Sequence, residues 1–285
     1  MNAHPGYLLC TDLDRTLLPN GNAPESPGAH KRFTELVTRS DVALAYVTGR
    51  HRALVEQAIG DYALPRPDYV VGDVGTSIYA LEDGGWRSWD GWAQEIAPDW
   101  GGLQHDALAN LFSDIGVLRQ QEPEKQSRFK LSYYAPADTA VEGLLEEMER
   151  RLETREILAA LIWSIDETSG TGLLDVLPAR ATKLHAVEFL MRRAGFAPDR
   201  TVFSGDSGND LPVLASSVQS VLVANASEEV RARAVQMAAE QDASAALYIA
   251  RGGFMGMNGN YSAGILEGFV HFIPQAAAWL GSKQV

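Results

Sequence analysis

The chain has 285 residues, enough for one large domain or two modest ones, and its 46% hydrophobic and 21% charged residues are typical of a globular protein. With 37 acidic and 24 basic side chains its formal charge is −13, which argues against nucleic acid or an anionic membrane surface as the main partner. Its single cysteine excludes an intrachain disulfide. The N-terminus lacks the basic start and apolar stretch of a signal peptide, and no apolar run is long enough to span a bilayer, so we expect a cytoplasmic protein.

The first part of the chain predicts alternating strands and helices. Short apolar runs indicate buried strands, and the segments between them have the spacing of amphipathic helices. We expect strands at 7–11, 41–47 and 69–71, helices at 29–39 and 52–59, and the start of a hairpin at 76–81. Alternation at this spacing is typical of a parallel, doubly wound sheet.

The middle of the chain changes character at about residue 83. Four of the six tryptophans fall between Trp86 and Trp100, which predicts a packing surface in preference to a sugar-stacking surface. Helices are then predicted at 103–112 and 141–152, and strands at 129–134 and 157–165. This interleaving indicates a small α+β module, residues 83–171, inserted into a main domain made of residues 1–82 and 172–285.

The last part of the chain is predicted to belong to the main domain. The segment 172–178 is where the chain returns to it, and we expect strands at 201–204 and 218–223, and helices at 183–194, 228–238 and 262–272. Between them, the Gly- and Met-rich loop 251–260 is the segment that we expect to be most mobile.

Polar side chains follow three of the predicted core strands. Asp12 and Asp14 end the first, Thr48-Gly-Arg50 ends the second, and Asp206-Ser-Gly-Asn-Asp210 ends the strand at 201–204. In a parallel sheet these carboxyl ends share one edge, where ligands bind. Facing carboxylates suit Mg²⁺, and Thr48 with the Gly49 amide suits a phosphate oxygen.

Two interpretations of Asp12 and Asp14 remain open at this point. Two carboxylates this close resist being charged together, so one can be an ionised nucleophile that forms an acyl-phosphate while the other donates a proton. The alternative is a strand end with a helix-capping Asp. Lys183, at a predicted helix start, is either the group that neutralises charge during displacement on phosphorus or a solvated residue.

These segments together resemble the motifs of the haloacid dehalogenase (HAD) superfamily. The matching residues stand in the expected order: Asp12-Leu-Asp-Arg-Thr16, Thr48, Lys183 and Gly205-Asp-Ser-Gly-Asn-Asp210. The inserted module is similar to the C2-type cap of the phosphatase branch. The resemblance implies an α/β protein, with a HAD-like Rossmannoid parallel-sheet core and an inserted α+β cap.

Shorter strings resemble sucrose-phosphate phosphatases and their close relatives. They are Ala45-Tyr-Val-Thr-Gly-Arg50, Gly75-Thr-Ser-Ile-Tyr79, Phe129-Lys-Leu-Ser-Tyr133, Leu174-Asp-Val-Leu-Pro178 and Ser262-Ala-Gly-Ile-Leu-Glu267. From about Trp86 to Glu122 we recognise no such string.

The resemblance also implies roles for individual residues. Asp12 is the expected nucleophile and Asp14 the general acid and base, with Thr48 and Lys183 completing the catalytic set. Mg²⁺ would be held by Asp12, the Asp14 carbonyl and Asp206, with Asp210 and Asn209 close behind.

Substrate binding is assigned to residues of both parts of the chain. Those expected to bind substrate are Thr48, Gly49, Arg50, Asn209, Lys130, Asp175 and Arg180. Lys130 is equally compatible with an exposed strand residue, and Asp175 and Arg180 with structural ion pairs.

The sequence thus favours a Mg²⁺-dependent phosphatase whose partner is a small-molecule sugar phosphate, with sucrose 6-phosphate first. Phosphatases for other glycosyl phosphates (of the mannosylfructose, glucosylglycerol or glucosylglycerate type) and a sugar phosphomutase remain alternatives. No coiled coil or long apolar stripe marks an interface, so we expect a monomer or a small homo-oligomer.

Overall fold

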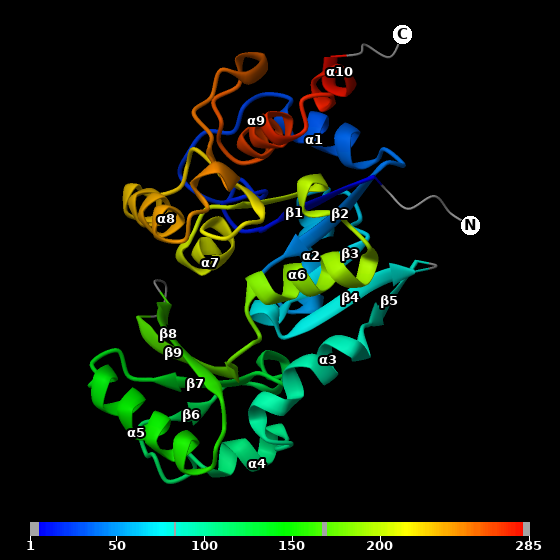
Figure 1. Ribbon diagram of the computed structural model, residues 1–285. Coiled ribbons are helices and arrows are strands. Elements are labelled where there is room, and N and C mark those ends of the chain that lie inside the picture. Colours follow the sequence, from blue (N-terminus) through cyan, green and yellow to red (C-terminus); the bar gives the residue numbers. More distant parts are fainter. Residues whose placement is uncertain (1–5, 83, 167–169, 282–285) are drawn as a thin grey trace. The chain divides into compact units, whose positions relative to one another are not determined.

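The computed structural model describes residues 6–82, 84–166 and 170–281 and divides the chain into two units (Figure 1). The core unit is built from both ends of the chain, up to Ser88 and from Lys183 onward, and the inserted unit is the continuous segment Trp89–Thr182. The predicted boundaries, at 82/83 and 171/172, lie six and eleven residues before those of the two units. In the described ranges no helix is long and apolar enough to cross a membrane.

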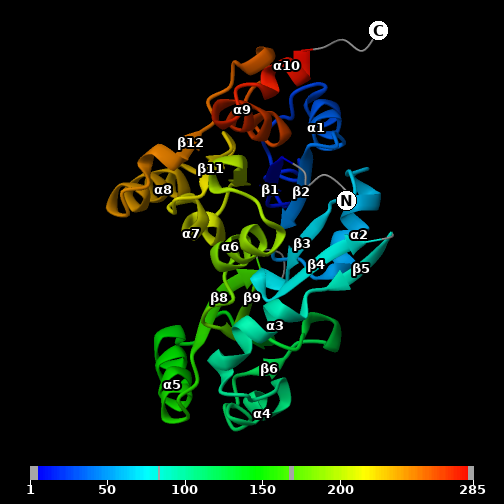
Figure 2. The ribbon, with the colours of Figure 1, turned by 45° about the vertical axis from the view of Figure 1, so that its right-hand side comes forward.

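Within the described residues, the core unit contains one eight-stranded sheet. Its strands are β1 (Tyr7–Thr11), β2 (Val42–Val47), β3 (Tyr69–Gly72), β4 (Ser77–Glu82), β5 (Gly85–Ser88), β10 (Thr201–Gly205), β11 (Gln219–Leu222) and β12 (Leu247–Ile249). Their order is β12-β11-β10-β1-β2-β3-β4-β5, which Figure 2 shows from β11 to β5. The strands from β12 to β3 are parallel, which confirms the predicted doubly wound sheet.

Helices cover both faces of this sheet. They are α1 (Ala29–Val37), α2 (Arg52–Asp61), α6 (Lys183–Ala194), α7 (Leu211–Leu214), α8 (Glu228–Glu240), α9 (Ser262–Phe272) and α10 (Ala276–Gly281). Helices α1 and α9 lie side by side although they come from opposite ends of the chain (Figure 1). Phe33 of α1 and Phe269 of α9 are both fully buried there, against sheet residues such as Leu44. Strands β1, β2 and β10 are covered on both faces, so nearly all of their residues are buried. This explains why each of them has a continuous apolar sequence, from which it was predicted.

The hairpin expected after β3 is present as β4 and β5, and it accounts for the first boundary shift. β5 pairs antiparallel with β4 from Glu82↔Gly85 to Tyr79↔Ser88 and so belongs to the core sheet. Of the four clustered tryptophans, Trp92 and Trp100 are almost fully buried in the inserted unit, as predicted, whereas Trp86 and Trp89 are partly buried.

The inserted unit has its own antiparallel sheet, four-stranded within the residues described, with order β6-β7-β9-β8. Its strands are β6 (Arg119–Gln120), β7 (Leu131–Ala135), β8 (Ala159–Asp166) and β9 (Thr171–Pro178), and its helices are α3 (Asp90–Ile96), α4 (His105–Asn110) and α5 (Val141–Thr154). The sequence assigned the segment 172–178 to the main domain, but β9 pairs with both β7 and β8. Along most of β9 buried residues alternate with half-buried ones, as in an antiparallel sheet that packs on one face. This alternation differs from the continuous burial of the core strands and indicates the antiparallel sheet.

The loop 251–260, which we expected to be mobile, makes several specific contacts. The buried Glu267 carboxylate accepts hydrogen bonds from the amides of Arg251 and Gly252, at 2.8 and 2.9 Å. The side-chain amides of Asn258 and Asn260 both donate to the Pro24 carbonyl. These bonds tie the loop to α9 and to the loop that follows β1.

Candidate active site

Asp12 lies at the carboxyl edge of the core sheet, directly after its central strand. Its amide donates to the Ser204 carbonyl at 2.9 Å, which continues the pairing of β1 with β10 by one residue. The side chain is nearly buried. Three residues on, Arg15 has a φ of 58°, so the chain turns away from the strand direction.

An acidic cluster forms where Asp12 meets the loop after β10. Carboxylate oxygens of Asp12, Asp206 and Asp210 lie within 4.8 Å of one another, and all three residues are buried. The ammonium of Lys183, the first residue of α6, lies 3.1 Å from Asp12 Oδ1 and 2.7 Å from Asp210 Oδ1. It also donates to Asn209 Oδ1 at 3.0 Å. Three segments that the sequence singled out separately, at Asp12, at Lys183 and at residues 206–210, thus meet in one cluster.

The electrostatics of this cluster favour an added cation. Burial raises the pKa of Asp12 to about 7, although the Lys183 ammonium opposes the shift. Burial also raises the pKa of Asp206 to about 6, and the charge of Asp210 adds to the effect. Burial alone would lower the pKa of Lys183, but the charges of Asp12 and Asp210 raise it overall. Carboxylates that resist ionisation together are suited to a divalent cation such as Mg²⁺.

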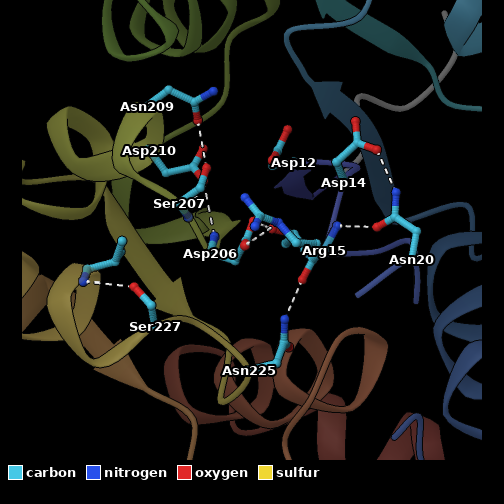
Figure 3. A network of polar contacts seen from close by, with 12 residues as sticks. Asp12, Asp14, Arg15, Asn20, Asp206, Ser207, Asn209, Asp210, Asn225 and Ser227 are labelled. Carbon is cyan, nitrogen blue, oxygen red and sulfur yellow. Dashed lines mark hydrogen bonds and ion pairs between the residues drawn. The ribbon is translucent and has the colours of Figure 1, made fainter. Parts of the chain in front are cut away.

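The loop after β10 is shaped around Asp210. Its Oδ2 accepts hydrogen bonds from the amides of Asp206 and Ser207, both at 3.1 Å, and from the Ser207 hydroxyl (Figure 3). A Cβ at Gly205 would lie 2.5 Å from Asp210 Cγ, so this approach requires glycine. Asp206 is oriented separately, by the Thr16 hydroxyl at 2.9 Å from its Oδ1.

Asp14 faces a different set of partners from Asp12. Arg50 donates to both of its carboxylate oxygens, with Nη2 at 2.6 Å from Oδ1 and Nε at 2.8 Å from Oδ2. Asn20 Nδ2 donates to Oδ1 at 2.7 Å (Figure 3). Partial burial acts to raise the pKa of Asp14, but the hydrogen bonds and charge of Arg50 hold it below its usual value. Arg50, which we expected to bind substrate, is paired here with the expected general acid.

Thr48 and Gly49 lie beside a strained turn. Thr48 is buried, and its hydroxyl accepts a hydrogen bond from the Arg50 amide at 3.2 Å. The turn at Asp73–Gly75 has three consecutive residues with positive φ, among them the β-branched Val74 at 60°. A Cβ at Gly49 would lie 3.9 Å from a methyl group of Val74, and the Asp73 amide donates to the Arg50 carbonyl. Such strain is typical of functional sites.

The three expected sugar-binding residues of the inserted unit do not form one group. Lys130 Nζ lies 3.5 Å from Asp175 Oδ1, which also accepts a hydrogen bond from the Ser132 hydroxyl. Arg180 instead pairs with the buried Asp99, whose carboxylate accepts from its Nε and its amide at 2.7 Å each. For Arg180 the structure thus contains the ion pair that the sequence left open as the alternative.

A family model for sucrose-6F-phosphate phosphohydrolases matches residues 5–273 of the chain. The protein belongs to this family. It is a HAD-type sugar phosphatase, as the resemblance implied, and its fold is a HAD-like α/β core with a cap domain.

Individual relatives of this phosphatase family extend over most of the chain. A HAD-like hydrolase of Nitrosococcus oceani is 55% identical over 273 residues, which is 96% of this chain and 73% of that protein. The mannosylfructose-phosphate phosphatase of Agrobacterium fabrum is 29% identical over 79% of this chain and 86% of its own length. The structure of the sucrose-phosphatase from Synechocystis sp. PCC6803, in complex with sucrose and phosphate, has a TM-score of 0.70 at 28% identity and covers 94% of this chain and 98% of its own.

One residue of the phosphatase site, Asn20, was missed by the sequence. It lies in a turn-rich loop and carries no motif, so nothing marked its contact with Asp14. Asn225 follows β11, and the sequence left open whether it braces its loop or touches ligand. Its side-chain amide braces the loop, because it joins the Arg15 carbonyl, at 2.6 Å, to the Tyr261 amide, at 2.9 Å.

Proposed function

We propose that the protein is a Mg²⁺-dependent phosphatase that hydrolyses sucrose 6-phosphate through an aspartyl-phosphate on Asp12. The observation that carries the proposal is the convergence of Asp12, Lys183 and the Asp206–Asp210 loop at one edge of the core sheet. This edge is where ligands of parallel α/β sheets bind. The family match supplies the class of substrate.

The proposed chemistry runs in two displacements. A carboxylate oxygen of Asp12 forms a bond to phosphorus while the bond between phosphorus and the sugar oxygen breaks, and Asp14 gives its proton to the departing oxygen. Asp14 then takes a proton from water as the water oxygen attacks the aspartyl-phosphate, which releases phosphate and restores Asp12. Lys183 favours the ionised form of the Asp12 carboxylate and orients it for the first displacement.

The donor set suits the metal that this chemistry requires. Asp12, Asp206 and Asp210 offer hard carboxylate oxygens close together, and Mg²⁺ prefers a few such ligands with phosphate oxygens and water. Mg²⁺ bound there would neutralise charge on the phosphoryl oxygens. The Asp14 carboxylate instead accepts hydrogen bonds from Arg50 and Asn20. In the proposal Asp14 therefore binds the metal through its main-chain carbonyl.

Arg50 has two roles in this proposal. In its present pair with Asp14 it favours the ionised carboxylate, which is the form that activates water and not the form that protonates a leaving group. A phosphate dianion in the site competes for the guanidinium, which releases Asp14 to carry a proton. Arg50 thus remains a substrate-binding residue in the proposal, because its guanidinium exchanges Asp14 for the phosphate when substrate binds.

Removal of divalent metal is expected to abolish phosphatase activity, and added Mg²⁺ to restore it. Ca²⁺ should inhibit, because it takes more ligands in looser geometry and misplaces the nucleophile. Binding should also raise the melting temperature of metal-free protein, since a ligand of the folded state stabilises it. Phosphate release and thermal unfolding measure both effects.

Asp206→Asn is the test variant for the metal site, and Asp41→Asn is its matched control. Asp41 pairs with Arg39 on the surface, so its variant should keep the full Mg²⁺-dependent rise in melting temperature, whereas Asp206→Asn should lose most of it. Full activity after exhaustive chelation would end the metal proposal.

The enzyme is expected to prefer sucrose 6-phosphate to glucose 6-phosphate and fructose 6-phosphate. The core residues recognise features common to any phosphate monoester, so selection depends on the inserted unit. A site whose buried polar groups are left unpaired by a smaller substrate rejects it strongly. Lys130→Ala and Asp175→Ala should therefore erode the preference, read as the ratio of kcat/KM values.

Lys31→Ala is the matched control for the substrate test, because Lys31 faces an acidic partner, Glu35, on the exposed side of α1. Mannosylfructose phosphate belongs in the same panel, given the relative that acts on it. Equal kcat/KM for the hexose monophosphates and the disaccharide would remove the sucrose assignment and leave a general sugar phosphatase. Dependence on a sugar bisphosphate, with no phosphate released, would instead indicate the phosphomutase.

A further inference from the structure

The side chain of Asn20 links the carboxylate of Asp14, the expected general acid, to the main-chain amide of the next residue, Arg15. Its Nδ2 donates to Asp14 Oδ1 at 2.7 Å, and its Oδ1 accepts from the Arg15 amide at 2.8 Å (Figure 3). Both contacts are hydrogen bonds in one orientation of the amide only, since a flip would set donor against donor. The side chain of Asn20 therefore has a single arrangement that satisfies both partners.

Arg15 gives this contact its rigidity. Its left-handed φ of 58° is unfavourable for a residue other than glycine and persists only where other contacts enforce it. Asn20 binds its amide, and Asn225 binds its carbonyl at 2.6 Å (Figure 3). Side-chain amides thus fix both the N–H and the carbonyl of Arg15. Among the described contacts, Asn20 is the one of these two residues that also donates a hydrogen bond to Asp14.

The two partners of Asp14 differ in what they allow it to do. Arg50 is a cation and strongly favours the carboxylate form, whereas the neutral Asn20 amide favours it less and can donate either to a carboxylate or to the carbonyl oxygen of a protonated carboxyl group. With Asn20 on Oδ1, Oδ2 is the oxygen left to carry a proton once Arg50 has turned to the phosphate. Asn20 can therefore hold Asp14 in both displacements.

We propose that Asn20 is the positioning residue for Asp14: it fixes the direction of the carboxyl group toward the leaving oxygen and then toward water. The proposal rests on the acid–base role of Asp14 in the proposed function. It predicts that loss of Asn20 weakens proton transfer and leaves the attack by Asp12 intact.

Leaving-group dependence distinguishes this role from a structural one. A sugar oxygen leaves poorly without a proton, whereas 4-nitrophenolate leaves readily without one. The ratio kcat/KM reports the steps up to departure of the leaving group and not the later attack of water, which is common to both substrates. Asn20→Ala should lower kcat/KM roughly 10- to 100-fold on the sugar phosphate, a part of the full general-acid contribution, and by less than about 3-fold on 4-nitrophenyl phosphate. The sugar phosphate used is sucrose 6-phosphate or fructose 6-phosphate, whichever the wild type hydrolyses faster.

Two further variants serve as controls for local structure. Asn20→Asp keeps the acceptor for the Arg15 amide and loses the donor to Asp14, so it should show the same selective loss. Asn225→Ala disturbs the other end of Arg15 without removing a bond to Asp14, so any loss should be equal for the two substrates. If each Asn20 variant loses activity by the same factor on the sugar phosphate and on 4-nitrophenyl phosphate, the positioning role is overturned.

Asp14→Asn, measured in the same assay, separates the two proposals. If it slows the sugar phosphate selectively and the Asn20 variants do not, the inference about Asn20 alone is overturned. If it slows both substrates equally, the acid role of Asp14 is wrong and the positioning role is overturned with it.

Discussion

Asp12→Asn is expected to leave no detectable phosphatase activity on any substrate, including a generic aryl phosphate. An amide is too poor a nucleophile to form the acyl-phosphate. The same change removes one of the carboxylates clustered around Lys183, which lowers the repulsion within a buried site. We therefore expect the free energy of unfolding of the metal-free protein to stay equal or increase, as measured by urea denaturation.

This combination separates loss of chemistry from loss of fold. In the wild type, acid quenching during turnover should trap a phosphoryl group on the peptide that contains Asp12, detected by mass spectrometry. Asp41→Asn, on the surface of the core unit, should retain both activity and trapping. Substantial turnover by Asp12→Asn would exclude the covalent mechanism.

Lys183→Met is expected to produce the largest loss of stability among single substitutions in the site. The side chain is 2% exposed and its ammonium contacts Asp12, Asn209 and Asp210. Removal of one partner from a buried ion pair leaves the other charges uncompensated, at a cost of roughly 3–5 kcal/mol. Urea unfolding of the metal-free protein at neutral pH measures this, and activity should be lost as well.

Two comparisons make the Lys183 result interpretable. Lys31→Met, on the exposed face of α1, should change the unfolding free energy by less than about 0.5 kcal/mol. Added Mg²⁺ should recover part of the stability of Lys183→Met, since a bound cation supplies the missing positive charge. An unfolding free energy equal to that of the wild type would show that the contacts of Lys183 contribute little.

The core sheet could be predicted because local pattern and final environment agree there. β1 and α6 begin and end where the apolar run and the helical spacing placed them, since both are packed against the same core. β9 was misassigned because its place depends on pairing with β7 and β8, which lie elsewhere in the sequence. The short elements α7, α10 and β12 carry too few periodic residues to be recognised.

The acidic cluster could be predicted from the topology of the sheet, whereas the contacts around Asp14 could not. Asp12 and Asp206 each follow a parallel strand, so the sheet edge brings them together whatever the loops do. The contacts of Arg50 and Asn20 with Asp14 depend on how the chain turns at Arg15. That turn is fixed by two side-chain amides, Asn20 in the same loop and Asn225 from a distant segment, and no periodic pattern encodes either contact. The Asp99–Arg180 pair, whose partners are 81 positions apart in the sequence, could not be predicted for the same reason.

The central strands β1 and β10 are adjacent in the sheet but separated by most of the chain, and this governs the order in which the protein can fold. Contacts between residues far apart in sequence form late, whereas a continuous segment folds as a unit. The inserted unit, Trp89–Thr182, has all of its strands as soon as it has been synthesised. The edge of β1 must wait for β10, and until then Asp12 has no Asp206 beside it. We therefore expect a nascent chain to complete its insertion before it can complete the catalytic edge.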